Sequence, residues 1–328
     1  MNRARIAVIG LGKMGLLHVS IMNMMPNVDV VALCDKSYLL RKFVSKIFKK
    51  AQIVSDIEHF TDLDLDSIYI ATPIPIHFAL VKRLYSEKVT RNLFVEKTLA
   101  ADWDQARELV KLSKTYKGVN MVGYMKRFSV TFQKAKAILN QGTLGELTNF
   151  DAVAFSSDFS MVNEGSKAPA SRGGVLGDLG SHVIDLAHYF FGDFEVESAK
   201  LESLIGGLSE DSARFKVKKS LLEGQFNVSW CNDGYRMPSF GLNIKGRKGY
   251  LNVTDDFVKL DLSGNSKTWF KHDLHDHVKF LLGDSEYYRE DEYFISSLLS
   301  GNATEPSFLT ASKVDYTIDQ IKKKAGKN

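Results

Sequence analysis

The sequence predicts a two-domain α/β protein, in which a doubly wound parallel sheet precedes an α+β domain with a mostly antiparallel sheet. In the first 123 residues, short apolar runs rich in strand-forming residues alternate with amphipathic stretches of helical length. The first apolar run leads directly into a glycine-rich turn. From residue 124 the alternation is replaced by successive short strands with turn residues between them. These observations place one domain at residues 1–123 and a second at residues 124–328.

The elements of the first domain follow from its hydrophobic pattern. Five runs, such as "RIAVIG" and "VDVVALCD", are nearly continuous in apolar residues, as strands buried on both faces of a parallel sheet should be. Asp102 is the predicted N-cap of a helix whose apolar residues recur at helical spacing. We expect strands over residues 5–10, 28–35, 67–72, 92–97 and 118–124, and helices over residues 13–24, 37–49, 75–87 and 102–116.

The second domain begins with a helix and a long strand and ends with two helices. Gly142 ends the first helix, and a loop rich in Gly, Ser and Ala spans residues 160–173. Successive strands joined by turn residues predict a mostly antiparallel sheet. We expect helices over residues 128–141, 177–191, 285–300 and 308–324, one strand over 146–159 and several strands within 194–270.

The composition is that of an ordinary globular protein, and it excludes several functions. The 43 basic and 39 acidic residues leave a net charge of +4, which is too small and too dispersed for nucleic acid binding. No stretch approaches the ~20 apolar residues of a membrane span. Cys34 and Cys231 form no CxxC pattern and no disulfide framework, which indicates a reducing compartment. We therefore expect a cytoplasmic protein that binds neither nucleic acid nor membrane.

A histidine-rich segment, "KHDLHDH", contains His272, His275 and His277. Their spacing fits no standard zinc signature, and the segment has the character of a surface loop. There is no G-x-S-x-G motif, and neither cysteine lies in an activating sequence context. We expect no metal site and no serine or cysteine nucleophile.

The segment "IAVIGLGKMGLLH" contains the pattern G-x-G-x-x-G at Gly10, Gly12 and Gly15, between the first strand and the first helix. In dinucleotide-binding proteins the first glycine permits a tight turn, the second admits the pyrophosphate, and the third lets the helix pack against the strand. The helix N-terminus then presents free N–H groups to the phosphates. We expect a nicotinamide dinucleotide in contact with these glycines and with Lys13 and Met14.

Asp35 ends the second strand, 20 residues after Gly15, where dinucleotide sites carry an acidic residue. Its carboxylate can accept hydrogen bonds from both ribose hydroxyls and would repel the 2′-phosphate of NADP. Asp35 therefore favours NAD. The adjacent Lys36 and the nearby Arg41 can offset that repulsion, so NADP is an alternative cofactor.

Two further strand ends carry polar side chains where a ligand is expected, because doubly wound sheets bind ligands beyond the carboxyl ends of their strands. Thr72, Pro73 and His77 follow the third strand, and Glu96 and Lys97 end the fourth. We assign all five to the cofactor site. Lys97 would also face the crevice and exchange a proton there. The alternatives are a surface lysine and, for His77, a helix-start residue bonded to local backbone.

The segment "GGVLGDLGSHVIDLAHYFFG" predicts a second group of proton-handling residues. In a helix from residue 178 onward, Asp178 and His182 are i, i+4 neighbours, and Asp185 lies three residues beyond His182. Two carboxylates then flank one histidine, which they can orient and make more basic. The alternative is an ordinary polar helix face.

Tyr124, Lys126, Arg127 and Arg172 lie on segments that can line the second half of the cleft. Cationic side chains there would bind a phosphorylated or nucleotide-linked sugar, and Arg172, in a glycine-flanked loop, is the best placed. The alternative for each cation is a surface position or a structural ion pair.

Together these features resemble the Gfo/Idh/MocA family of oxidoreductases, named for glucose–fructose oxidoreductase and inositol 2-dehydrogenase. The resemblance implies an N-terminal Rossmann domain and a C-terminal α/β domain whose large open sheet is often used for oligomer contacts. It also implies NAD(P)-dependent redox of sugars, cyclitols or nucleotide sugars. The resemblance rests on the glycine loop, Asp35, "ATPIPIH", the Glu-Lys pair at 96–97, "GYMKRF", "GTLGEL" and the pattern G-G-x-L-x-D-x-G-x-H-x-x-D from Gly173 to Asp185.

By position, the resemblance implies that Lys97 is the lysine of the family's E-K-P motif and that Asp178 and His182 complete the catalytic set. Asp185 matches a frequent substrate contact. Thr98 replaces the usual proline, which removes a restriction on the backbone beside Lys97. Substrate contacts are then expected from Lys97, Tyr124, Arg127, Arg172, His182 and Asp185.

The resulting hypothesis is a reversible alcohol oxidation. Hydride passes to the nicotinamide, His182 takes the hydroxyl proton, and Lys97 bonds the reacting oxygen. We expect a homodimer or homotetramer. Two alternatives remain: another Rossmann dehydrogenase, acting on amino acids or opines or resembling biliverdin reductase, and a non-catalytic NAD-sensing protein.

Overall fold

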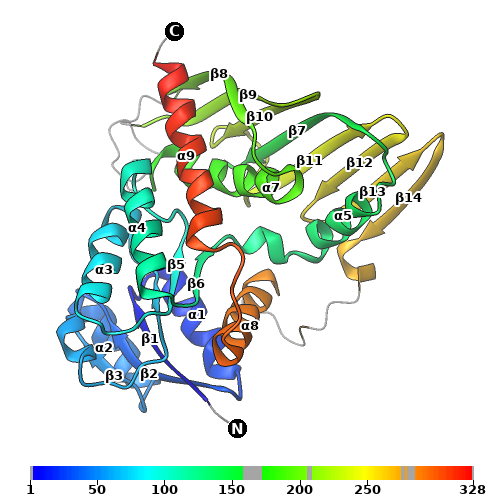
Figure 1. Ribbon diagram of the computed structural model, residues 1–328. Helices are drawn as coiled ribbons and strands as arrows, with labels where there is room; N and C mark the ends of the chain where they lie inside the picture. The colour runs from blue at the N-terminus through cyan, green and yellow to red at the C-terminus, as the bar shows by residue number, and fades with distance from the viewer. Residues whose placement is uncertain (1–2, 158–171, 205–208, 275–277, 279–284, 327–328) are drawn as a thin grey trace. The chain divides into compact units, whose positions relative to one another are not determined.

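The computed structural model describes residues 3–157, 172–204, 209–274, 278 and 285–326. The chain forms two compact units, one of residues 1–124 with 280–312 and the other of residues 125–279 with 313–328. Each unit is built on its own sheet (Figure 1). Residues 285–300, which the sequence assigns to the second domain, pack within the first unit.

The first unit contains a six-stranded parallel sheet in the order β3-β2-β1-β4-β5-β6. In this order the chain changes direction across the sheet between β1 and β4, and dinucleotides bind at such a switch point. The sheet confirms the predicted doubly wound fold. Its strands are β1 (Ala4–Ile9), β2 (Val28–Cys34), β3 (Gln52–Val54), β4 (Ser67–Ile70), β5 (Leu93–Glu96) and β6 (Asn120–Gly123).

Helices cover both faces of this sheet. Asp102 accepts a hydrogen bond from the Gln105 N–H at 2.9 Å, which confirms it as an N-cap. Helices α1 (Lys13–Met24) and α8 (Ser285–Ser300) pack together on one face, and α3 (Ile74–Ser86) and α4 (Trp103–Tyr116) pack together on the other (Figure 1). Helix α2 (Tyr38–Ile47) and the 3-10 helix η1 (Ile57–Phe60) flank β3 in the sequence.

Strand β3 was not predicted, because its three residues carry no clear pattern. Gln52 is exposed, Ile53 half-buried and Val54 buried, so the strand shows neither an apolar run nor a full alternation.

Aromatic side chains hold α8 on the first sheet. Tyr69 of β4 stacks on Phe94 of β5 with ring centroids 4.4 Å apart. Phe294 of α8 meets both rings edge-on, at 5.4 and 5.5 Å. All three side chains are fully buried, which explains why this late segment belongs to the first unit.

The second unit contains an eight-stranded sheet in the order β14-β13-β12-β11-β7-β10-β9-β8. Strands β7 and β10 pair in parallel, and the other described pairs are antiparallel. This confirms the predicted large, mostly antiparallel sheet. The strands are β7 (Leu147–Phe155), β8 (Glu195–Glu202), β9 (Ser212–Lys219), β10 (Leu222–Ser229), β11 (Ser239–Gly246), β12 (Gly249–Thr254), β13 (Phe257–Leu262) and β14 (Asn265–Phe270).

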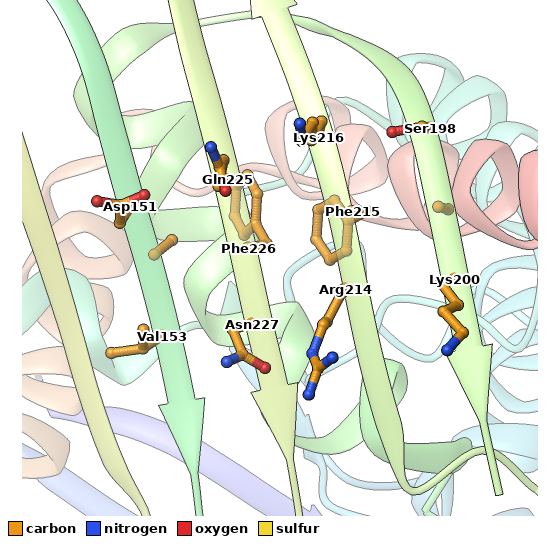
Figure 2. A pocket seen from close by; sticks show the side chains of 12 residues that line it. Asp151, Val153, Ser198, Lys200, Arg214, Phe215, Lys216, Gln225, Phe226 and Asn227 are labelled. Atoms are coloured by element: carbon orange, nitrogen blue, oxygen red, sulfur yellow. The ribbon is translucent and has the colours of Figure 1, made fainter.

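The two faces of this second sheet differ in character. Helices α5 (Val130–Asn140) and α7 (Ser181–Phe191) cover one face, where Phe150 stacks on Phe191 with ring centroids 4.3 Å apart. The opposite face is polar, because strand alternation turns side chains such as Arg214 and Lys216 outward. A hollow with a volume of about 610 Å³ lies across β7, β10, β9 and β8, and Figure 2 shows the side chains that line it.

The remaining described elements are a closing helix and three short turns. They are α9 (Phe308–Ala325), η2 (Met125–Phe128) and η4 (Lys271–Leu274), together with a short helical turn, η3 (Leu176–Gly180), before α7. No helix in the described part of the chain is both long and apolar enough to cross a membrane.

Candidate active site

The glycine loop connects β1 to α1 and leaves open space at one position only. Gly10 has φ +90°, and a Cβ there would lie 2.6 Å from the Ala71 carbonyl oxygen. A Cβ on Gly15 would lie 1.8 Å from the Gly10 carbonyl oxygen. A Cβ on Gly12 would meet nothing within 4 Å. Gly10 and Gly15 are thus required by the packing of the loop, whereas Gly12 leaves room for a ligand.

That open space lies at the start of α1. Gly12 is the N-cap residue and makes no side-chain capping bond, so the first turn of α1 presents backbone N–H groups that no side chain caps. Such an N-terminus suits a pyrophosphate. The residues present therefore fit the dinucleotide that the motif predicts, with Lys13 and Met14 in the first turn.

Asp35 follows β2 and is fixed beside the glycine loop. Its Oδ2 accepts the Leu11 N–H at 2.7 Å, and its Oδ1 accepts the Ser37 N–H at 2.7 Å. Each carboxylate oxygen can accept a second hydrogen bond, and Asp35 remains half-buried rather than enclosed. The carboxylate is therefore oriented and still able to bind the hydroxyls of a ribose.

The two cations near Asp35 make bonds within the protein. Lys36 Nζ lies 2.5 Å from Asp56 Oδ2, and the hydrogen bond from Lys36 lowers the pKa of Asp56 to about 2. Arg41 Nη1 donates to the carbonyl oxygens of Asp35 and Lys36 at 2.7 and 2.8 Å. Neither cation is therefore held ready for a 2′-phosphate, which favours NAD over NADP.

His77 lies inside the fold at the start of α3. It is fully buried, and burial lowers its pKa. Its Nε2 lies 2.8 Å from the Thr72 carbonyl oxygen, and its Nδ1 lies 2.8 Å from the Thr98 carbonyl oxygen. His77 thus links the loop after β4 to the loop after β5, as the backbone-bonded alternative implies. Thr72 is half-buried and Pro73 is exposed in the first of these loops.

Lys97 follows β5 directly and is half-buried, whereas Glu96 before it is buried. Glu96 Oε2 accepts the backbone N–H of Lys97 at 3.1 Å. The Lys97–Thr98 peptide bond is cis, and Thr98 Oγ1 donates to the Ala100 carbonyl oxygen at 2.9 Å.

A buried histidine that belongs to no predicted site also contacts Glu96. His18 of α1 places Nε2 2.8 Å from Glu96 Oε1 and Nδ1 2.8 Å from Asp291 Oδ1 of α8. The only sequence signal was a histidine one turn after Gly15, on a helix face that is otherwise apolar. The Asp291 contact spans 273 residues and had no local signature.

In the second unit, the segment before α7 is not an ordinary helix. Residues Leu176–Gly180 form a turn of π-helix, and α7 starts at Ser181. Asp178 therefore lies in the π turn, and its relation to His182 differs from the expected α-helical i, i+4 spacing. His182 is buried, with its ring edge-on to Phe240 at 5.3 Å.

The two arginines expected to meet a ligand form ion pairs with the carboxylates of the same region. Arg127 in η2 makes a bidentate pair with Asp185, at 2.7 and 2.6 Å, and both side chains are buried. Arg172 lies 3.2 Å from Asp178 Oδ2 and is half exposed. Asp185 is therefore held by Arg127 through both carboxylate oxygens.

Two other expected cleft residues are also enclosed. Lys126 pairs with Asp255 at 2.7 Å and lies over the Phe240 ring at 5.0 Å. Tyr124 is fully buried in the first unit.

The structure describes the histidine-rich segment only as far as residue 274, so His275 and His277 lie outside the described residues. His272 is exposed and lies 3.4 Å from Asp273. Among the residues that the structure describes, no group of three or more His, Cys, Asp or Glu side chains is arranged so that it could hold a metal ion.

The strand order, the open N-terminus of α1 and the fixed Asp35 define a dinucleotide-binding protein of the Rossmann class. Residues 4–124 match the family described as "Oxidoreductase family, NAD-binding Rossmann fold", and residues 132–252 match the "GFO/IDH/MocA C-terminal domain". The chain therefore belongs to the Gfo/Idh/MocA family of NAD-binding oxidoreductases.

Individual relatives agree with this assignment. Myo-inositol 2-dehydrogenase of Thermotoga maritima is 26% identical over 59% of this chain and 56% of its own length. Inositol 2-dehydrogenase of Rhizobium meliloti is 22% identical over 92% of this chain and 91% of its own. The chain spans about half the length of several curated relatives, 53% and 56% in two of them.

Solved structures share the fold over the whole chain. Levoglucosan dehydrogenase, in a complex with NADH and levoglucosan, matches with a TM-score of 0.88 and 19% identity. The match covers 99% of this chain and 98% of that one. This likeness establishes the fold of both units.

Proposed function

We propose that this protein is an NAD-dependent dehydrogenase that oxidises a secondary alcohol of a sugar or cyclitol. One observation carries the proposal: Asp35 and Lys97 both follow strands at the carboxyl edge of one parallel sheet, which also carries the glycine loop. Asp35 suits the ribose of NAD, and Lys97 suits the oxygen of an alcohol. The activities named for the inositol and levoglucosan dehydrogenases support the same class of reaction.

Bound NAD would supply the hydride acceptor. The glycine loop would hold its pyrophosphate and Asp35 its ribose. Further contacts are proposed from Lys13, Met14, Lys36, Thr72 and Pro73.

The chain's own residues would handle the proton. As the substrate C–H bond breaks and its electron pair leaves as hydride, the hydroxyl proton passes to His182 and a carbonyl forms. Lys97 donates a hydrogen bond to the reacting oxygen as its charge develops. Asp178 orients His182. This catalytic set is the one that the family resemblance implies.

The ion pairs of the second unit support an uncharged substrate. Arg127 is bonded to Asp185, and Arg172 to Asp178, so each positive charge already faces a carboxylate. A phosphate would have to compete with those carboxylates. We therefore place neutral sugars and cyclitols ahead of nucleotide-linked sugars. Tyr124 and Arg127 are buried, so we place them behind the other expected residues as direct substrate contacts.

The proposal is tested by screening inositols, aldoses, amino sugars and nucleotide sugars with NAD and NADP, following the absorbance of the reduced nicotinamide. Turnover of a neutral polyol with NAD is the expected result. NAD binding without turnover on any alcohol would instead favour a sensing protein. Turnover confined to amino acids or opines would favour the other class of Rossmann dehydrogenase.

Location and assembly complete the proposal. Neither cysteine forms a disulfide, which supports a reducing compartment such as the cytoplasm. The polar face of the second sheet supports self-association as a homodimer or homotetramer, because two copies can pair their charged and amide side chains there.

A further inference from the structure

The first unit contains a buried histidine between two buried carboxylates. His18 lies on α1, Glu96 on β5 and Asp291 on α8. Nε2 of His18 lies 2.8 Å from Glu96 Oε1, and Nδ1 lies 2.8 and 2.9 Å from the two oxygens of Asp291. None of the three side chains is more than about a tenth exposed.

This geometry places a proton in each of the two contacts of the imidazole. Both ring nitrogens face carboxylate oxygens, so each of the two contacts requires one shared proton. Burial lowers the pKa of His18, but Asp291 and Glu96 outweigh that effect and raise it well above its usual range. Burial raises the pKa of Glu96, yet the hydrogen bond and charge of His18 lower it overall. Glu96 is therefore held as a carboxylate that accepts from His18.

Aromatic rings enclose the imidazole. The ring centroids of Phe94, Tyr69 and Tyr287 lie 5.2, 5.5 and 6.4 Å from that of His18. A ring held on these sides and bonded at both nitrogens has one available orientation. His18 is thus a fixed donor to Glu96.

The other oxygen of Glu96 reaches the backbone of Lys97. Oε2 accepts the Lys97 N–H at 3.1 Å. Gly123 of the neighbouring β6 lies next to this oxygen, since a Cβ added at Gly123 would lie 3.3 Å from it. Glu96 is consequently held at both oxygens and has little room to adopt another rotamer.

We propose that the Asp291–His18 pair is a positioning device that fixes Glu96 and, through it, the backbone from which the Lys97 side chain extends. His18 and Asp291 are positioning residues: they act through Glu96 and take no proton from the substrate. The part of this inference that concerns turnover rests on the proposed role of Lys97.

The test in solution is a double-mutant cycle between His18→Leu and Lys97→Met. His18→Leu is expected to lower kcat by roughly 10- to 100-fold, the scale on which small misplacements of a catalytic group act, with little change in the Kd of NAD. If His18 acts through Lys97, the double variant is no slower than Lys97→Met alone. Fully multiplicative losses would overturn the proposal.

A second arm does not depend on activity. In crystal structures of the wild-type chain and the His18→Leu variant, the Glu96 carboxylate is expected to move and to lose its contact with the Lys97 N–H. An unchanged Glu96 and Lys97 would overturn the proposal. If the wild-type protein turns over no alcohol, the proposed function fails, while these structures still decide the positioning role.

Two further variants control for damage to the fold. If His18→Leu does not fold, Asp291→Leu replaces it in both arms with the same expected results, because this variant removes the acceptor of His18 Nδ1. His188→Gln changes a histidine of the second unit whose side chain is 5% exposed, and it is expected to leave kcat and the Lys97 backbone unchanged.

Discussion

The choice of cofactor depends on one carboxylate. Asp35 accepts two backbone N–H groups and still has acceptor capacity for a ribose. We predict that Asp35→Ser raises the Kd of NAD by about 10- to 100-fold, since a hydrogen bond to a charged acceptor contributes about 1.5–3 kcal/mol. Isothermal titration calorimetry measures this directly. NADP should lose less affinity than NAD, because the repulsion of its 2′-phosphate disappears. An unchanged Kd for NAD would remove Asp35 from the site.

A second residue links stability to pH. Burial lowers the pKa of His188 from 6.5 to about 4, and the ring stacks on Phe194 at 4.3 Å. Between these two pH values the unfolded chain binds more protons than the folded chain at this position, so acidification lowers the free energy of unfolding. The slope is at most about 1.4 kcal/mol per pH unit.

His188→Gln should flatten that part of the stability curve. The glutamine can still bond to Thr317, whose hydroxyl lies 3.0 Å from the histidine Nε2. Urea unfolding of both proteins at a series of pH values measures the difference in their free energies of unfolding. The buried His18 and His77 contribute equally in both proteins, so they do not affect this difference. Equal slopes for wild type and variant would show that His188 does not titrate in this way.

At the scale of elements, the β1–α1 loop separates packing from binding. A Cβ on Gly15 would lie 1.8 Å from a backbone oxygen, whereas one on Gly12 would meet nothing within 4 Å. We predict that Gly15→Ala lowers the free energy of unfolding by about 1–3 kcal/mol, because the backbone must shift. Gly12→Ala should change it by less than about 0.5 kcal/mol. Denaturant unfolding measures both.

NAD affinity should nevertheless fall in both glycine variants. In Gly12→Ala the added methyl group occupies the open space before the α1 N-terminus, where the pyrophosphate would bind. Gly12→Ala is therefore the matched control that weakens binding without destabilising the fold. Full NAD affinity in Gly12→Ala would contradict a dinucleotide at this loop.

Most elements could be predicted because they carry local signals. The Asp102 cap and the positive φ of Gly142 mark helix ends that the sequence shows directly. Strand β3 lacked such a signal, because an edge strand of three residues needs no hydrophobic period. The π turn at Leu176–Gly180 was also missed, because an α-helix and a π-helix share nearly the same side-chain pattern over one turn.

At the scale of the whole molecule, the fold class followed from the alternation of strands and helices, and the nucleotide half of the site followed from its motif. The ion pairs of the second unit and the buried cluster of His18, Glu96 and Asp291 could not be predicted from the sequence. Arg127 and Asp185 are 58 residues apart and His18 and Asp291 are 273 apart, so only tertiary packing brings them together. Residue types indicated that these groups needed partners, but not which partners they have.

Self-association is a property of the whole molecule. If the polar face of the second sheet joins two copies, light scattering after size exclusion should give the mass of a dimer or tetramer. Lys216→Glu, in the hollow of Figure 2, should shift the mass toward the monomer. Lys111→Glu, an exposed change on α4, is the matched control. A wild-type monomer would contradict the proposal.

The central claim is that Lys97 and His182 serve an NAD-dependent alcohol oxidation. The most direct test is the steady-state rate of NAD reduction by wild type, Lys97→Met and His182→Ala on the best polyol from the screen. Each substitution should lower kcat by ~10²-fold or more, the usual loss when a general acid–base group is removed, while NAD still binds. A near-wild-type kcat in either variant would contradict the role given to that residue, and no turnover of any alcohol by the wild-type protein would contradict the claim itself.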